Sequence, residues 1–214
     1  MIYANGMTAN AGSNAGSGVV RSTWANFPAA SSVAAGTVYM ASDYNNSEWV
    51  SDGTYWKPRG GRQRPFVMAA AVSSTGTTSE VNAWAPTIPA GMLFPMCSVE
   101  FGCTVVKTGT AGTLVLRKRY NGVAGTTIGY GNAISAPNIG ASAFAKVTAG
   151  VASGGNLTLT QSYPSQISGF GQSVAASVGV THVMANAVTL NLTLLASSAA
   201  DTINITNAFV EICG

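Results

Sequence analysis

A strict two-residue alternation of apolar and polar side chains is the pattern that most constrains how this chain folds. In AVTLNLTLLAS, residues 187–197, Leu190, Leu192 and Leu194 alternate with polar residues. Successive side chains of a β-strand point to opposite faces of the sheet, so this period predicts a half-buried strand. No window of the sequence has convincing helical periodicity. We therefore expect an all-β protein.

Similar runs recur along residues 62–214. The closing segment DTINITNAFVEIC changes the phase of its alternation near Asn207, which predicts a β-bulge. A tight turn is expected at Asn121 and Gly122, and a long connection at 129–143. Further strands are expected at 64–72, 79–86, 95–107, 112–120, 144–151, 156–162 and 177–184. This number of strands predicts an antiparallel two-sheet sandwich of the jelly-roll type over residues 62–214.

Residues 21–61 form a separate block that is rich in tryptophan. Its aromatic and β-branched runs, Thr37 to Ser42, Glu48 to Ser51 and Thr54 to Pro58, predict a small three-stranded β-meander. Asp52 and Gly53 form the hairpin turn between the last two runs. So few strands bury little surface, so a second surface must cover the large rings of this block. That surface is either the sandwich or a partner protein.

Residues 1–20 contain mainly Gly, Ala, Ser and Asn and have no period. Such a segment behaves as a flexible arm and has no core of its own. The expected organisation is therefore an N-terminal docking arm at 1–20, a meander at 21–61 and a sandwich at 62–214.

The charge content is low and narrows the classes of function. Only 8% of the residues are charged, against about 25% in ordinary soluble domains, and the net charge is +3. The basic residues are scattered instead of forming the stripe that nucleic-acid binding requires, so nucleic acid is not an expected partner. The longest apolar run, 66–72, is too short to span a membrane, and the N-terminus does not resemble a signal peptide.

Candidate reacting groups are few. His182, the only histidine, lies in an expected strand and lacks the sequence context of a nucleophile and base. The carboxylates Asp43, Glu48 and Asp52 are close in sequence, but turn and strand positions favour structural roles over glycoside hydrolysis. Cys97 and Cys103 are six positions apart, too far for a disulfide within one strand. We therefore expect no catalytic residue, no cofactor and no metal site, and the pairing of the third cysteine, near the C-terminus, stays open.

Two parts of the chain resemble tailed-bacteriophage structural proteins. The segment GTVYMASDYNNSEWVSDGTYWKPRGG resembles their short tryptophan-rich module, in which a Gly-Thr start, an Ala-Ser-Asp turn and a Trp-Val-Ser-Asp-Gly-x-x-Trp hairpin recur; residues 27–61 carry this match. The segments GTAGTLVLRKRYNGVAGTTIG and VTLNLTLLASSAADTINITNAFVEI resemble the jelly-roll domains of phage fibres and capsid-decorating proteins. The resemblance implies a virion protein of the capsid-decorating, head-fibre or short tail-fibre type, assembled in the host cytoplasm.

Two hypotheses of function follow. In the first, the arm and meander dock on phage capsid or tail proteins while the sandwich projects or forms a homotrimer. The expected docking residues are Trp24, Trp49, Trp56, Arg59 and Arg62. In the second, the jelly-roll binds a glycan of the host surface through exposed aromatic side chains. The expected glycan contacts are Trp84, Tyr130, Tyr163 and Phe170.

Overall fold

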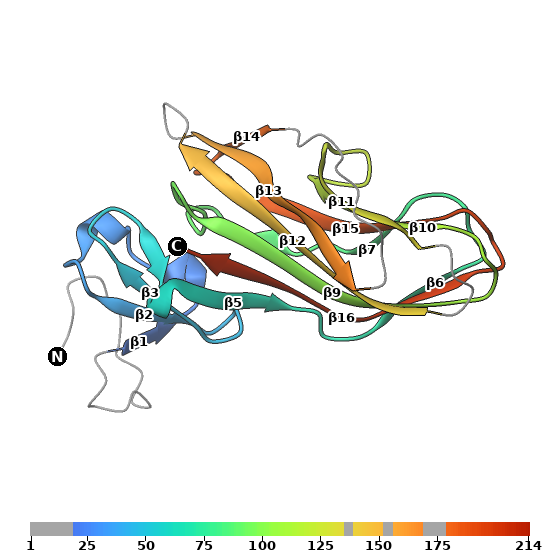
Figure 1. The fold of residues 1–214 in the computed structure, drawn as a ribbon. Coiled ribbons are helices and arrows are strands. Elements are labelled where there is room, and N and C mark those ends of the chain that lie inside the picture. The colour runs from blue at the N-terminus through green and yellow to red at the C-terminus, as the bar shows by residue number, and fades with distance from the viewer. Residues whose placement is uncertain (1–18, 135–138, 152–155, 169–178) are drawn as a thin grey trace.

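The computed structural model describes residues 19–134, 139–151, 156–168 and 179–214 (Figure 1). The chain is all-β, as the sequence predicts. The described helices are three single 3₁₀ turns, η1 (Trp24–Asn26), η2 (Ala30–Ser32) and η3 (Arg59–Gly61), and no helix in this part of the chain is long and apolar enough to cross a membrane. A small sheet lies at one end of an elongated body, and the long strands of the sandwich run away from it.

The small sheet contains the three strands of the predicted meander and one more. Its strand order is β1 (Val19–Ser22), β2 (Val38–Ala41), β3 (Ser47–Ser51) and β4 (Trp56–Pro58). β1 runs parallel to β2, so Val19 and Val20, which were predicted to lie in the arm at 1–20, belong to the sheet. β1 was not predicted, because it is too short to show alternation and because its partner strand lies 19 positions further along the chain. The loop between β3 and β4 spans residues 52–55 and is longer than the expected two-residue turn.

The sandwich consists of two larger sheets. The five-stranded sheet contains β7 (Val81–Trp84), β8 (Thr87–Ile88), β10 (Leu114–Tyr120), β11 (Thr127–Ile134) and β15 (Val188–Ala196). The seven-stranded sheet contains β5 (Arg62–Val67), β6 (Val72–Thr75), β9 (Ser98–Thr108), β12 (Ile139–Val151), β13 (Asn156–Ser168), β14 (Val180–Val183) and β16 (Thr202–Cys213). β9 pairs with β16 and β10 with β15, so segments far apart in sequence form antiparallel ribbons.

Two local predictions for the sandwich have different outcomes. The bulge near Asn207 is confirmed, because the register of β16 against β9 shifts between Ile205 and Asn207. The prediction of a long connection at 129–143 is wrong, because most of this range lies in β11 and β12. Its Gly, Ala and Ser residues show no alternation, and pairing with β10 and β9 makes these residues extended.

The buried side chains form two hydrophobic clusters. The aromatic cluster joins the small sheet to the near end of the sandwich and includes Trp49, Trp56 and Phe94. The aliphatic cluster fills the space between the two large sheets and includes Leu192 and Leu194 from the alternating run that dominates the sequence. The small sheet and the sandwich therefore share a continuous core.

Candidate functional site

The three tryptophans of the predicted docking surface point into the protein. Trp24 is 8% exposed, Trp49 is fully buried and Trp56 is 5% exposed. The rings of Trp24 and Trp49 pack edge to face, with 5.0 Å between their centroids, and Trp56 packs edge to face against Tyr39 at 5.2 Å. Phe27 lies against Trp24 at 4.9 Å and against Trp56 at 5.3 Å. The expectation that these rings contact a partner directly therefore does not fit their burial.

The surface that covers these rings comes from the chain itself. The segment with η1 and η2 folds back across the inner face of the small sheet, and the indole N–H of Trp56 donates to the carbonyl of Pro28 at 3.0 Å. The indole N–H of Trp24 donates to the carbonyl of Ala90, in a loop of the sandwich, at 3.1 Å. Sequence reasoning left the sandwich and a partner open as the covering surface, and the fold places the rings against residues of this chain.

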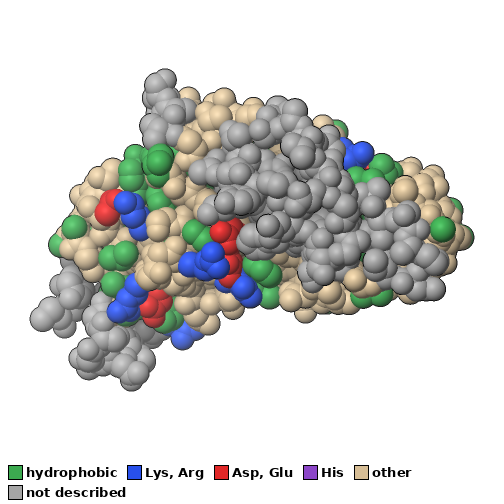
Figure 2. Space-filling model, viewed as in Figure 1, with side chains coloured by type: hydrophobic (Ala, Val, Ile, Leu, Met, Phe, Trp, Pro, Cys, Tyr) green, Lys and Arg blue, Asp and Glu red, His purple; other side chains and the backbone are tan. Residues whose placement is uncertain are grey.

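Arg59 and Arg62 both form ion pairs within the chain. Arg59 pairs with Glu48 at 2.7 Å, and Arg62 pairs with Glu100 at 2.9 Å and with Glu211 at 3.3 Å. Figure 2 shows several Lys or Arg side chains (blue) beside Asp or Glu side chains (red) on the visible face. The side chains of both arginines are about half exposed, and a role in orienting a partner stays a prediction.

The predicted glycan contacts on the sandwich are only partly described. Trp84 lies at the end of β7 and is half-buried between the two hydrophobic clusters. Tyr130 lies in β11 and Tyr163 in β13, but their side chains, like the whole of Phe170, lie outside the described residues. Glycan binding by these four residues stays a prediction.

The outer face of the small sheet carries an apolar row that sequence reasoning missed. Along β2 and β3 the side chains alternate, so Tyr39 and Trp49 point into the core and their neighbours point outward. The sheet register aligns Val19 with Val38 and Val38 with Val50 across three strands. We call these three valines the valine row. The two-residue alternation identifies this outer face only when the direction in which the tryptophans point is already known.

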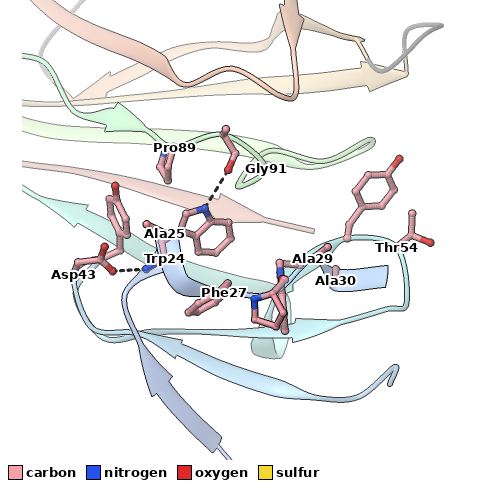
Figure 3. Close-up of a pocket in the computed structure, with 14 residues that line it drawn as sticks. Trp24, Ala25, Phe27, Ala29, Ala30, Asp43, Thr54, Pro89 and Gly91 are labelled. Atoms are coloured by element: carbon pink, nitrogen blue, oxygen red, sulfur yellow. Dashed lines mark hydrogen bonds between the residues drawn. The ribbon is translucent and has the colours of Figure 1, made fainter. Parts of the chain in front are cut away.

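An open groove of about 510 Å³ lies between the small sheet and the sandwich (Figure 3). Four segments form it: residues 24–30, residues 43 and 44, residues 54–56 and residues 89–91. Trp24 and Phe27 lie in the middle of the close-up, with Asp43 on one side and Thr54 on the other. The segments are far apart in sequence, so no local motif could have revealed the groove.

The polar groups of the groove have few partners within the protein. One carboxylate oxygen of Asp43 accepts the backbone N–H of Trp24 at 2.9 Å. Burial, and then the charge of Asp43, raise the pKa of Tyr44, which therefore stays neutral. Within the described part of the chain, the second oxygen of Asp43 and the side-chain hydroxyls of Tyr44, Thr54 and Tyr55 have no hydrogen-bond partner.

The remaining candidate reacting groups have structural contacts. His182 is buried in β14, with its Nδ1 at 3.1 Å from the hydroxyl of Tyr120, and burial lowers its pKa. Glu48 pairs with Arg59, and Asp52 accepts backbone N–H groups within its own loop. Among the described residues, no three His, Cys, Asp or Glu side chains are grouped in a way that could hold a metal ion.

Comparisons with known proteins find no matching family model and no matching curated protein. Among solved structures, the chain is similar to the VP2 subviral particle of infectious bursal disease virus, with 12% identity and a TM-score of 0.33 over 71% of this chain and 33% of the other. The chain thus spans about a third of that capsid protein. It is also similar to the CBM2 module of the evolved Dit of Lactobacillus casei BL23 phage J-1, with 11% identity and a TM-score of 0.27 over 59% of this chain and 67% of the other. Neither TM-score is high enough to identify the function of this chain.

Proposed function

We propose that this protein is a structural component of a bacteriophage virion, which docks on the particle through its N-terminal arm and small sheet. The residues that support docking are those of the valine row. Apolar side chains in register on three neighbouring strands form a flat surface that a protein partner can cover without leaving polar groups unpaired. The partner in this proposal is a capsid or tail protein of the particle.

The surroundings of the valine row fit a protein partner better than a charged polymer. On the neighbouring strand Lys57 pairs with Asp52 at 2.8 Å, and Arg59 pairs with Glu48. These pairs neutralise the charges beside Val50, and Arg21 on β1, which donates to the side chain of Asn46, adds a single positive charge, so little net charge is left to attract an anionic partner. The arm joins the sheet at Val19, a member of the row, so the arm and the row would reach the same partner.

In the same proposal the sandwich projects from the particle and forms a homotrimer. The low charge content leaves much weakly polar surface for contacts between copies. Light scattering of the purified protein at micromolar concentration checks this part, and a monomeric mass would contradict it.

The docking proposal is tested by placing a charge in the valine row. In Val50→Lys, an ammonium group replaces an apolar contact, and we expect the amount of protein in purified virions to fall at least about tenfold. The matched control is Val67→Lys, because Val67 is 48% exposed and lies on β5, in a different sheet. Quantitative mass spectrometry of virions assembled with each variant gives the occupancy.

The outcomes separate the two levels of the proposal. Absence of the wild-type protein from purified virions would refute a virion role. Equal occupancy by both lysine variants would retain the virion role but remove the valine row from the docking surface. Circular dichroism of the purified variants shows whether each is folded before occupancy is compared.

A further inference from the structure

We propose that the groove between the small sheet and the sandwich binds a chain of neutral sugars. The groove is large enough for a ligand, because small-molecule sites typically enclose about 300–1,000 Å³. Its location is distinct from the valine row, which lies on the opposite face of the small sheet. The proposal therefore goes beyond particle docking and does not depend on it.

The lining of the groove matches the two kinds of surface that a sugar ring presents. Five aromatic side chains contribute to it: Trp24, Phe27, Tyr44, Tyr55 and Trp56. Trp24 and Trp56 are almost fully buried and form the floor, so the partly exposed rings of Phe27, Tyr44 and Tyr55 are the ones that a sugar contacts. Aromatic faces carry partial negative charge, so they attract the weakly positive C–H groups of a sugar ring. The hydroxyls at the edge of the sugar then need donors and acceptors around the rings.

The unpaired polar groups of the groove supply these donors and acceptors. The second oxygen of Asp43 accepts two hydrogen bonds, and the hydroxyls of Thr54 and Tyr55 both donate and accept. Asp43 and Thr54 lie on opposite sides of Trp24 and Phe27, so a ligand that bridges Asp43 and Thr54 passes Phe27 (Figure 3). Sugars carry hydroxyls on opposite edges of an apolar ring face and so use both sets of groups.

Other ligand classes use only part of this lining. An acyl chain leaves the carboxylate and hydroxyls unpaired, and an isolated cation uses the carboxylate but not the hydroxyls. The carboxylate of Asp43 repels phosphate groups and acidic sugars, and the lining contains no basic side chain to compensate. Neutral sugars are therefore the class that the groove fits best.

The walls of the groove are held in place before a ligand arrives. The indole N–H groups of Trp24 and Trp56 each donate to a backbone carbonyl, and Asp43 is held by the backbone N–H of Trp24. Because these side chains are already ordered, a ligand loses little binding energy to ordering the site.

Binding is tested with three neutral tetrasaccharides, chitotetraose, cellotetraose and maltotetraose, using saturation-transfer NMR and calorimetry on the full chain. We expect at least one to bind, and Asp43→Asn to weaken this binding about tenfold, the effect of removing one hydrogen bond to a charged group. Thr54→Val keeps the shape of the side chain and removes its hydroxyl, so binding weakens about threefold to tenfold. The control Met96→Ala removes a side chain that is 72% exposed outside the groove, and binding stays unchanged.

Several outcomes would overturn the proposal. One is failure of all three tetrasaccharides to bind at millimolar concentration. Another is binding that Asp43→Asn and Thr54→Val leave intact but Trp84→Ala removes, which places the sugar on the sandwich. A third is displacement of a bound sugar by a synthetic peptide of residues 1–18, with tighter, Asp43-dependent binding of that peptide, which makes the arm the natural occupant. Thr54 is exposed, so its variant keeps the test valid if Asp43→Asn disturbs folding.

Discussion

The two hydrophobic clusters of this protein are built in different ways. The aromatic cluster contains Trp24, Trp49 and Trp56, and each of their indole N–H groups needs a particular acceptor. The aliphatic cluster contains leucine, valine and isoleucine from alternating strands, which need only an apolar neighbour. Large rings with polar atoms fix one arrangement of the surrounding loops, whereas aliphatic side chains fill space between sheets whose hydrogen bonds already fix the geometry.

This difference places both proposed interaction surfaces at the aromatic end. With its largest rings pointing inward, the small sheet presents the valine row to the outside. The loops that carry the rings also form the groove. The sandwich contributes residues 89–91 to this end, in a loop flanked by Ile88 and Met92 of the aromatic cluster.

The largest expected effect is that of Trp49→Ala, because the ring is fully buried. Removing it leaves a cavity and takes the donor from the hydroxyl of Ser47, which accepts the indole N–H at 2.8 Å. We expect a loss of about 3–5 kcal/mol in the free energy of unfolding, measured by urea denaturation. Leu194→Ala in the aliphatic cluster is the comparison, with an expected loss of about 3 kcal/mol.

Because the aromatic cluster includes residues of the small sheet and of the sandwich, Trp49→Ala should still unfold in one transition. Two separate transitions, with only the first shifted by the substitution, would show that the small sheet is an independent domain.

A smaller effect is expected from Glu80, a largely enclosed side chain directly before β7 of the five-stranded sheet. Burial by itself raises its pKa, but hydrogen bonds from Arg119, Thr193 and Arg117 outweigh burial and lower the pKa to about 2 from 4.5. A lowered pKa stabilises the fold above the unfolded-state value, so this contribution is complete above about pH 4.5 and is lost as the pH falls towards 2. The shift corresponds to about 3 kcal/mol, because one pKa unit is about 1.4 kcal/mol.

We expect Glu80→Gln to lower the free energy of unfolding by about 2–3 kcal/mol at pH 7 and by much less at pH 2.5. Urea denaturation at both pH values checks this expectation. An equal loss at the two pH values would mean that the charge of Glu80 does not stabilise the fold.

The smallest expected effect belongs to the ion pair of the small sheet. The hydrogen bond from Lys57, followed by the backbone N–H of Tyr55, lowers the pKa of Asp52 to about 2, the same value as for Glu80. The side chains of Asp52 and Lys57 are 32% and 43% exposed, so water and salt screen the pair. Lys57→Met should therefore cost only about 0.5 kcal/mol, and less in high salt. A cost as large as that of Glu80→Gln would remove the distinction between exposed and enclosed ion pairs in this protein.

The all-β class and most strand positions could be predicted from the sequence, because alternation is a local property of the chain. The Leu190–Leu194 run and the bulge near Asn207 are direct examples. The turn between β3 and β4 was predicted to contain only Asp52 and Gly53, but residues 54 and 55 also belong to this loop. The strand residues at 129–134 and 139–143 were missed, because the Gly, Ala and Ser residues there are extended only through pairing with β10 and β9.

The sequence by itself determined that this chain is a β-protein with a tryptophan-rich block before the sandwich, since the period of two and the positions of the aromatic residues are local properties of the chain. Only the tertiary structure decided which way the tryptophans point. Alternation predicts that Trp49 and Val50 lie on opposite faces of the small sheet, but it does not predict which of the two faces is covered by other residues. The fold of η1 and η2 across the small sheet, with the loop at 89–91 beside it, makes that choice through long-range contacts. These contacts turn the rings inward, leave the valine row outside and bring Asp43 and Thr54 to the two sides of one groove.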